Sequence, residues 1–221
     1  MSASDFSVVY KPMLYGPVGE RLAFVSEQIV SKVSSRFSAV SFAGSCEQLP
    51  CPGNALLVLD RPCQRRDVHV LLPMESNKLK VEHGRCVLIP FGSGDSSLHA
   101  AQVGVRLAAD FRLRVIFYHT TWRKPGLESE DGWSHLSDGA RSNASKFKEL
   151  AMGRGLTHGV FIEIAAPTVK HGIIGAALQK QATMIVVARG SEIRKGSYVD
   201  QLAVMSPVPL FIVADSKKKE S

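Results

Sequence analysis

Between residues 85 and 215, short apolar runs alternate with segments that have an apolar face at helical spacing. The first run, at 85–92, is continuously apolar and ends in glycine, as is typical of a parallel strand buried on both faces. The segment 96–111 follows, with apolar residues at steps of three and four that predict an amphipathic helix. These residues are Leu98, Ala101, Val105 and Ala108.

The same alternation continues to the end of this region. We predict further strands at 113–122, 159–167, 183–190 and 208–215, and further helices at 140–154, 168–181 and 196–206. We expect the second helix to bury Ala140, Ala144, Phe147 and Ala151, and the third, capped by Thr168, to bury Val169, Ile173, Ala177 and Leu178. The polar, glycine-containing stretch 123–139 predicts a long loop. Because strands that alternate with helices pair in parallel through right-handed crossovers, we expect a three-layer α/β domain with a mostly parallel, five-stranded sheet.

The first third of the chain is less regular. Strand-like runs occur at 6–10, 38–44, 54–60 and 67–73, and an amphipathic helix is predicted at 18–33. This region is consistent with a shortened copy of the same architecture, although no sequence repeat links the two. We therefore divide the chain into a degenerate α/β region at 1–74, a linker at 75–84, the main domain at 85–215 and a disordered basic tail at 216–221.

Composition argues against several functions. The formal net charge is +7, but the basic residues are scattered and do not alternate with aromatic residues, so we do not expect nucleic-acid binding. No apolar run approaches the roughly 20 residues that span a bilayer, and the start lacks a signal-like pattern, so a cytoplasmic location is expected. The four cysteines and seven histidines match no metal-ligand spacing, and no Gly-x-Ser-x-Gly motif occurs. We expect neither a required metal nor an enzyme.

Three segments resemble the universal stress protein family. The stretch VLIPFGSGDSSLHAAQVGVRLA resembles the family's first strand, turn and alanine-rich helix. VIFYH is similar to its second strand, which often ends in histidine, here His119. MIVVARG followed by GSYVDQLAVMSPVPLFIV is similar to its last strand–loop–helix–strand unit. The match covers residues 85–215 and implies a regulatory or binding protein, with the adenine-nucleotide alpha-hydrolase type of fold, that binds ATP or AMP.

The resemblance also indicates where a nucleotide would bind, at the carboxyl ends of the parallel strands. Family members that bind ATP have two glycines followed by a Gly-Ser or Gly-Thr pair, because glycines let the backbone approach phosphates. Gly190 matches the second glycine, and Gly196 and Ser197 match the final pair, but Val187 replaces the first glycine and the intervening gap is shorter. The family's aspartate at the end of the first strand is Gly92 here, with Asp95 three residues later. The candidate site comprises Phe91, Gly92, Ser93, Asp95, His119, Arg189, Gly190, Gly196 and Ser197.

Two alternatives stay open at this point. The first is a module that binds no nucleotide and acts by dimerisation or partner binding. The second is a PP-loop-type ATP pyrophosphatase, because Ser93, Gly94, Asp95 and Ser96 resemble its phosphate loop with one position missing. In an ordinary turn, Asp95 or Ser96 would simply cap the next helix. Family members often dimerise through the last strand, which implies either a homodimer through 208–213 or an internal pseudo-dimer with the N-terminal region in that place.

Overall fold

The structure, a computed structural model, describes residues 39–42, 55–58, 69–72, 86–121, 132–164, 166, 168–189 and 198–214. The strand predicted at 6–10, the helix at 18–33, the linker at 75–84 and the tail at 216–221 lie outside the described residues. None of the described helices has the length and apolarity to cross a membrane.

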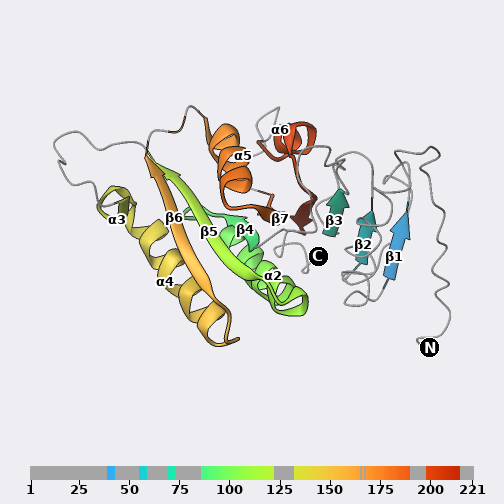
Figure 1. Ribbon diagram of the computed structural model, residues 1–221, viewed down its shortest axis with the longest axis horizontal. Helices are drawn as coiled ribbons and strands as arrows, with labels where there is room; N and C mark the ends of the chain where they lie inside the picture. The colour runs from blue at the N-terminus through green and yellow to red at the C-terminus, as the bar shows by residue number, and fades with distance from the viewer. Residues whose placement is uncertain are drawn as a thin grey trace, which may run out of the picture.

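All described strands belong to one sheet, which Figure 1 shows running across the molecule. The strands of the main domain are mutually parallel, as predicted, in the order β8-β7-β4-β5-β6. These are the five strands predicted for the main domain, and three N-terminal strands extend the described sheet to eight, in the order β1-β2-β3-β8-β7-β4-β5-β6. The strands are β1 (Ala39–Phe42), β2 (Ala55–Val58), β3 (His69–Leu72), β4 (Cys86–Pro90), β5 (Arg114–Thr121), β6 (His158–Ile164), β7 (Ala182–Ala188) and β8 (Leu210–Val213).

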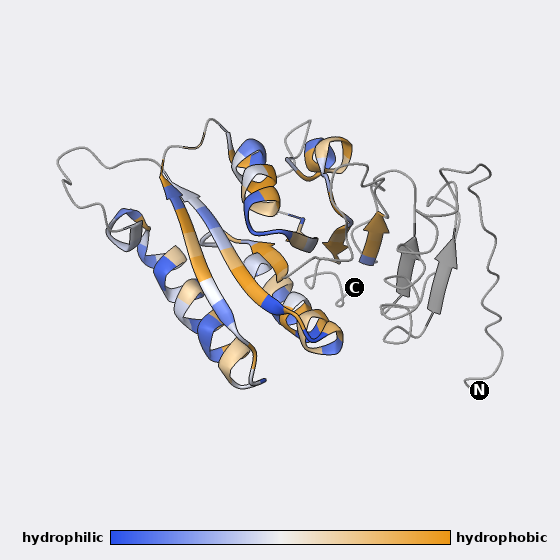
Figure 2. Ribbon diagram, in the orientation of Figure 1, coloured by the Kyte–Doolittle hydropathy of each residue, from blue (hydrophilic) through white to orange (hydrophobic). Residues whose placement is uncertain are grey.

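Helices cover both faces of the sheet, which confirms the three-layer prediction. The helices are α2 (Asp95–Phe111), α3 (Gly132–His135), α4 (Asp138–Met152), α5 (Val169–Gln179) and α6 (Tyr198–Met205). One core cluster packs α2 and α4 against the sheet, and a second packs α5 and α6 against the opposite face. Every residue of β7 and β8 is buried, as expected for strands covered on both faces. Figure 2 shows that the helices, in contrast, carry both hydrophobic and hydrophilic residues.

Several local expectations hold and others need correction. The predicted faces of α2 and α4 lie in the core, and Thr168 accepts a hydrogen bond from the His171 N–H as the cap of α5. However, Val169 and Leu178 are 50% and 42% exposed. The buried side of α5 consists of Gly172, Ile173, Ala176 and Ala177, because small residues let this helix lie close to the sheet.

Two further predictions were wrong in detail. The stretch 123–139 is not a loop throughout, because α3 and the first two residues of α4 fall within it. Neither Asp95 nor Ser96 caps α2, because the N-cap is Gly94, which has no side chain to accept a hydrogen bond. Asp95 is instead the first helical residue. Its negative charge there interacts favourably with the partial positive charge at the N-terminus of α2.

The last strand is not an edge of the sheet. β8 pairs in parallel with β7 on one side and antiparallel with β3 on the other, with Leu71 opposite Phe211. Of the two arrangements implied for this strand, internal pairing with the N-terminal region is therefore the one the structure has. The physical reason is that β3 supplies an equally apolar strand whose four residues are all buried.

Candidate functional site

The chain order reverses at β4, whose two neighbours in the sheet are β5 and β7. In a doubly wound sheet, such a reversal opens a crevice beyond the carboxyl ends of the strands. The segments that follow β4, β5 and β7 therefore line the place where a ligand is expected. These are Phe91–Asp95, the end of β5 at His119–Thr121, and Arg189 with the residues beyond it.

The turn between β4 and α2 is held by its own backbone and by one hydroxyl. The Phe91 N–H donates to the Tyr118 carbonyl at 2.9 Å, which continues the pairing with β5. The Gly92 N–H donates to Ser97 Oγ at 2.9 Å, and the Ser97 N–H donates to the Gly94 carbonyl at 3.1 Å. Ser93, Gly94 and Asp95 are exposed, so the outer side of this turn faces solvent.

A buried side-chain amide on α4 donates two hydrogen bonds to this turn. Asn143 Nδ2 donates to the Gly92 carbonyl at 2.9 Å and to the Gly94 carbonyl at 3.3 Å. Both carbonyls are thus bound to Asn143, whereas Ser93 and Gly94 themselves are exposed. Sequence analysis missed Asn143, although a polar residue between two core alanines on an apolar helix face was the available signal.

His119 joins this turn to β5. Its Nδ1 lies 2.8 Å from the Phe91 carbonyl, which can only accept, so Nδ1 carries the proton. Burial lowers the pKa of His119, partly offset by this hydrogen bond. The neutral ring therefore has an unprotonated Nε2, which can accept a hydrogen bond. The ring also packs on Phe91, with centroids 5.0 Å apart.

The carboxyl end of β7 contributes one buried cation. Arg189 is 7% exposed and directly follows the strand. Continuing the β4–β7 register, in which Leu88 pairs with Ile185, brings Arg189 level with Gly92. Tyr198, at the start of α6, donates to the Ala188 carbonyl at 3.2 Å, and burial raises the pKa of this phenol to about 12. The strand end is thereby fixed to α6.

A second polar pair lies on the opposite side of β5. The Tyr118 hydroxyl donates to Glu163 Oε2 of β6 at 2.5 Å. Burial, and then the neighbouring Glu163, raise the pKa of Tyr118 far above its ordinary value. Gly172 of α5 leaves the space for this pair, since a Cβ there would overlap with the Tyr118 hydroxyl. Sequence analysis did not identify this pair.

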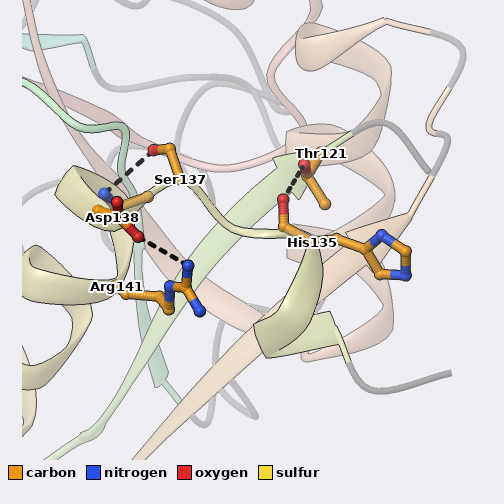
Figure 3. A network of polar contacts seen from close by, with 6 residues as sticks. Thr121, His135, Ser137, Asp138 and Arg141 are labelled. Carbon is orange, nitrogen blue, oxygen red and sulfur yellow. Dashed lines mark hydrogen bonds and ion pairs between the residues drawn. The ribbon is translucent and has the colours of Figure 1, made fainter. Parts of the chain in front are cut away.

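Short polar contacts position the start of α4, which supplies Asn143. Figure 3 shows them together: Ser137 Oγ accepts from the Ala140 N–H at 3.3 Å, and Asp138 pairs with Arg141 at 2.7 Å. Thr121 Oγ1, at the end of β5, donates to the His135 carbonyl at 3.2 Å. In addition, a Cβ on Gly139 would come within 2.9 Å of Ser93 Cβ, so glycine lets α4 approach the turn closely.

The structure thus brings together part of the predicted site. Phe91, Gly92 and His119 are linked through the hydrogen bonds and packing described above, Ser93 lies in the same turn, and Asp95 begins the adjoining helix. Gly190, Gly196 and Ser197 lie outside the described residues, so the glycine motif stays a prediction. No group of three or more potential metal ligands occurs within the described ranges. What the described turn offers a ligand is backbone N–H donors at the start of α2, which suits an anionic group.

Comparison with known proteins gives similar solved structures but no similar sequence. Neither the protein-family models nor the curated protein sequences give a match to the chain. Solved structures do. One is a universal stress protein in complex with cAMP, with a TM-score of 0.51 and 20% identity, covering 60% of this chain and 98% of that one. Another is a universal stress protein from Archaeoglobus fulgidus DSM 4304, with a TM-score of 0.50 and 15% identity, covering 69% of this chain and 51% of that one.

These similarities define the class of the fold. The described part of the chain has the α/β fold of the universal stress proteins, as the sequence resemblance predicted. At 20% identity or less, the likeness concerns the fold, and the ligand is a separate question.

Proposed function

We propose that this protein is a universal-stress-type regulatory domain that binds an adenine nucleotide, ATP or AMP, at the carboxyl ends of β4, β5 and β7. The observation that carries the proposal is the Phe91–Gly94 turn. Its carbonyls at Gly92 and Gly94 are bound to Asn143, and its exposed side lies at the N-terminus of α2, where partial positive charge favours phosphate.

Two other features support the proposal. His119 has an acceptor nitrogen at the same edge of the sheet, suited to the amino group of a base, and Arg189 adds a cation at the adjacent strand end. The similar structure solved with cAMP is an example of an adenine nucleotide on this fold. In this proposal the nucleotide also contacts Gly190, Gly196 and Ser197, and binding acts by shifting the population between two conformations.

The test is heat stabilisation by nucleotide. A ligand that binds only the folded state raises the midpoint of unfolding, so millimolar AMP, ATP or cAMP should raise the Tm of the purified protein. Gly94→Val should remove this effect. Gly94 has φ −83° and ψ 158°, which valine readily adopts, and the added Cβ would lie 3.9 Å from Ser96 Oγ, so the fold should tolerate a side chain that blocks the turn.

The matched control is Gly175→Val, on the exposed side of α5, where nothing lies within 4 Å of an added Cβ. This variant should keep the nucleotide shift even if its own Tm changes. The proposal is wrong if none of the three nucleotides shifts the Tm of the natural protein, or if Gly94→Val responds as strongly as Gly175→Val. A stable dimer without any nucleotide effect would favour the partner-binding alternative instead.

A further inference from the structure

The junction between β3 and β8 contains a buried histidine that belongs to neither the turn after β4 nor the proposed nucleotide site. His69 is the first residue of β3 and is 8% exposed. Its Nδ1 lies 3.1 Å from the backbone nitrogen of Ala214, which follows β8. Its ring packs on Phe211 with centroids 5.8 Å apart. His69 therefore connects the N-terminal strand to the end of the chain, 145 positions away.

The polarity of this hydrogen bond sets the protonation state. A backbone N–H can only donate, so Nδ1 of His69 must offer a lone pair to Ala214. His69 is thus neutral, with its single proton on Nε2. A second proton at Nδ1 would place the Nδ1–H of His69 and the Ala214 N–H, both donors, directly opposite each other. The Ala214 N–H would lose its acceptor, and a charge would appear in a buried position.

The surroundings add a second reason to resist protonation. His99 of α2 faces His69 with ring centroids 6.3 Å apart, so two positive rings would repel each other. On the same side of α2, at helical spacing from His99, lie the ionisable residues Asp95 and Arg106. β2, the remainder of β3, and β8 through Ala214 contain no ionisable side chain. Within the described residues, His99 is the ionisable side chain whose ring lies against that of His69.

We propose that His69 is a proton-sensitive latch that holds the N-terminal strand β3 on β8 and α2 at neutral pH and weakens that contact in mildly acidic solution. Because α2 also begins at the Phe91–Gly94 turn, the latch and the proposed nucleotide site share one helix. The proposal does not depend on nucleotide binding.

The sign of the pH dependence follows from the two states of His69. Burial, and then the charge of His99, lower the pKa of docked His69 from 6.5 to about 4. A released His69 takes up its proton near the ordinary value. The contribution of the latch is therefore complete above pH 6.5, declines as the pH falls, and is lost by about pH 4.

Hydrogen exchange in the full-length chain tests this directly. After correction for intrinsic exchange, protection of the amides of β3 and of 210–214 should fall by about tenfold for each pH unit between roughly 6 and 4.5. His69→Asn is the matched variant, because its side-chain oxygen can accept from Ala214 but does not titrate. Protection of the same amides in His69→Asn should lack this decline. His99→Asn should make this decline smaller and end it at a higher pH, because the pKa of docked His69 is then lowered less.

Two kinds of result would reject the latch. Equal pH dependence in the natural protein and His69→Asn would overturn the proposal. If the variant does not fold, the natural protein alone can be measured by NMR. The ¹⁵N chemical shifts should then show Nδ1 of His69 unprotonated at pH 7, and this ring should titrate well below pH 6.5. A ring protonated on Nδ1 at pH 7, or titrating at the ordinary value, would equally reject the latch.

Discussion

Single buried polar side chains decide how the site is built. Asn143 is the clearest case, because it lies on the apolar side of α4 among Ala140, Ala144 and Phe147. A buried amide is tolerated when its hydrogen-bonding groups are satisfied, and its two donated bonds both end on the turn after β4. At this scale, the helix and the turn are positioned by one side chain.

Replacing this side chain should destabilise the fold measurably. Asn143→Ala leaves the Gly92 and Gly94 carbonyls without their donor and opens a small cavity, so we expect a loss of about 1–3 kcal/mol in the free energy of unfolding. Urea denaturation followed by circular dichroism measures this loss. Ser142→Ala, at an exposed position beside it, is the control and should change stability by no more than about 0.5 kcal/mol. Identical midpoints for the two variants would show that the Asn143 bonds contribute little.

At the scale of elements, small residues set how closely helices approach the sheet. The buried side of α5 bears only one large side chain, Ile173, next to Gly172, Ala176 and Ala177. Gly172 lies over the Tyr118–Glu163 pair, whereas Gly175, on the same helix, faces open space. The two glycines therefore offer a matched test of the packing between α5 and β5.

The same substitution should have opposite effects at these two positions. Gly172→Ala places a methyl group on the Tyr118 hydroxyl and should cost about 1–3 kcal/mol of stability through overpacking. Gly175→Ala should stabilise by about 0.5–1 kcal/mol, because alanine is the better helix former. Chemical denaturation of both variants gives the comparison. Tyr118→Phe should recover part of the loss in Gly172→Ala, and a stability gain at both positions would contradict the packing described here.

At the scale of the whole molecule, one sheet joins the two parts of the chain. Leu71 of β3 is fully buried and lies in the same core cluster as Phe211 of β8 and the apolar sides of α2 and α4. The N-terminal strand thus contributes to the core of the main domain. Destabilising β3 should therefore destabilise the domain that follows it.

Tryptophan fluorescence can report this coupling, since both tryptophans, Trp122 and Trp133, belong to the region after residue 85. Leu71→Ala should lower the unfolding free energy monitored by these tryptophans by about 2–5 kcal/mol, because it leaves a cavity in the shared core. Val204→Ala, where the valine is 81% exposed, is the control and should have little effect. If Leu71→Ala leaves the fluorescence transition unchanged, the two parts unfold independently.

The amino-acid sequence by itself determined the order and the approximate limits of the elements after residue 85. Continuous apolar runs such as β7 and the apolar stripe of α4 are local patterns: the run predicts burial on both faces, and the stripe predicts which side of the helix is buried. Three of the N-terminal strand predictions, at 38–44, 54–60 and 67–73, are confirmed as β1, β2 and β3 for the same reason. The glycine motif at 190–197 stays a sequence prediction.

Only the tertiary structure decided which distant groups meet. The pairing of β3 with β8 depends on two strands about 140 positions apart, and no local periodicity selects a partner over that separation. The same holds for the bonds from Asn143 to the turn, for His69 against Ala214, and for the outward position of Val169 and Leu178 on α5. A local pattern specifies that a side chain is apolar or can hydrogen-bond, whereas the contacts that satisfy it depend on how the layers close around it.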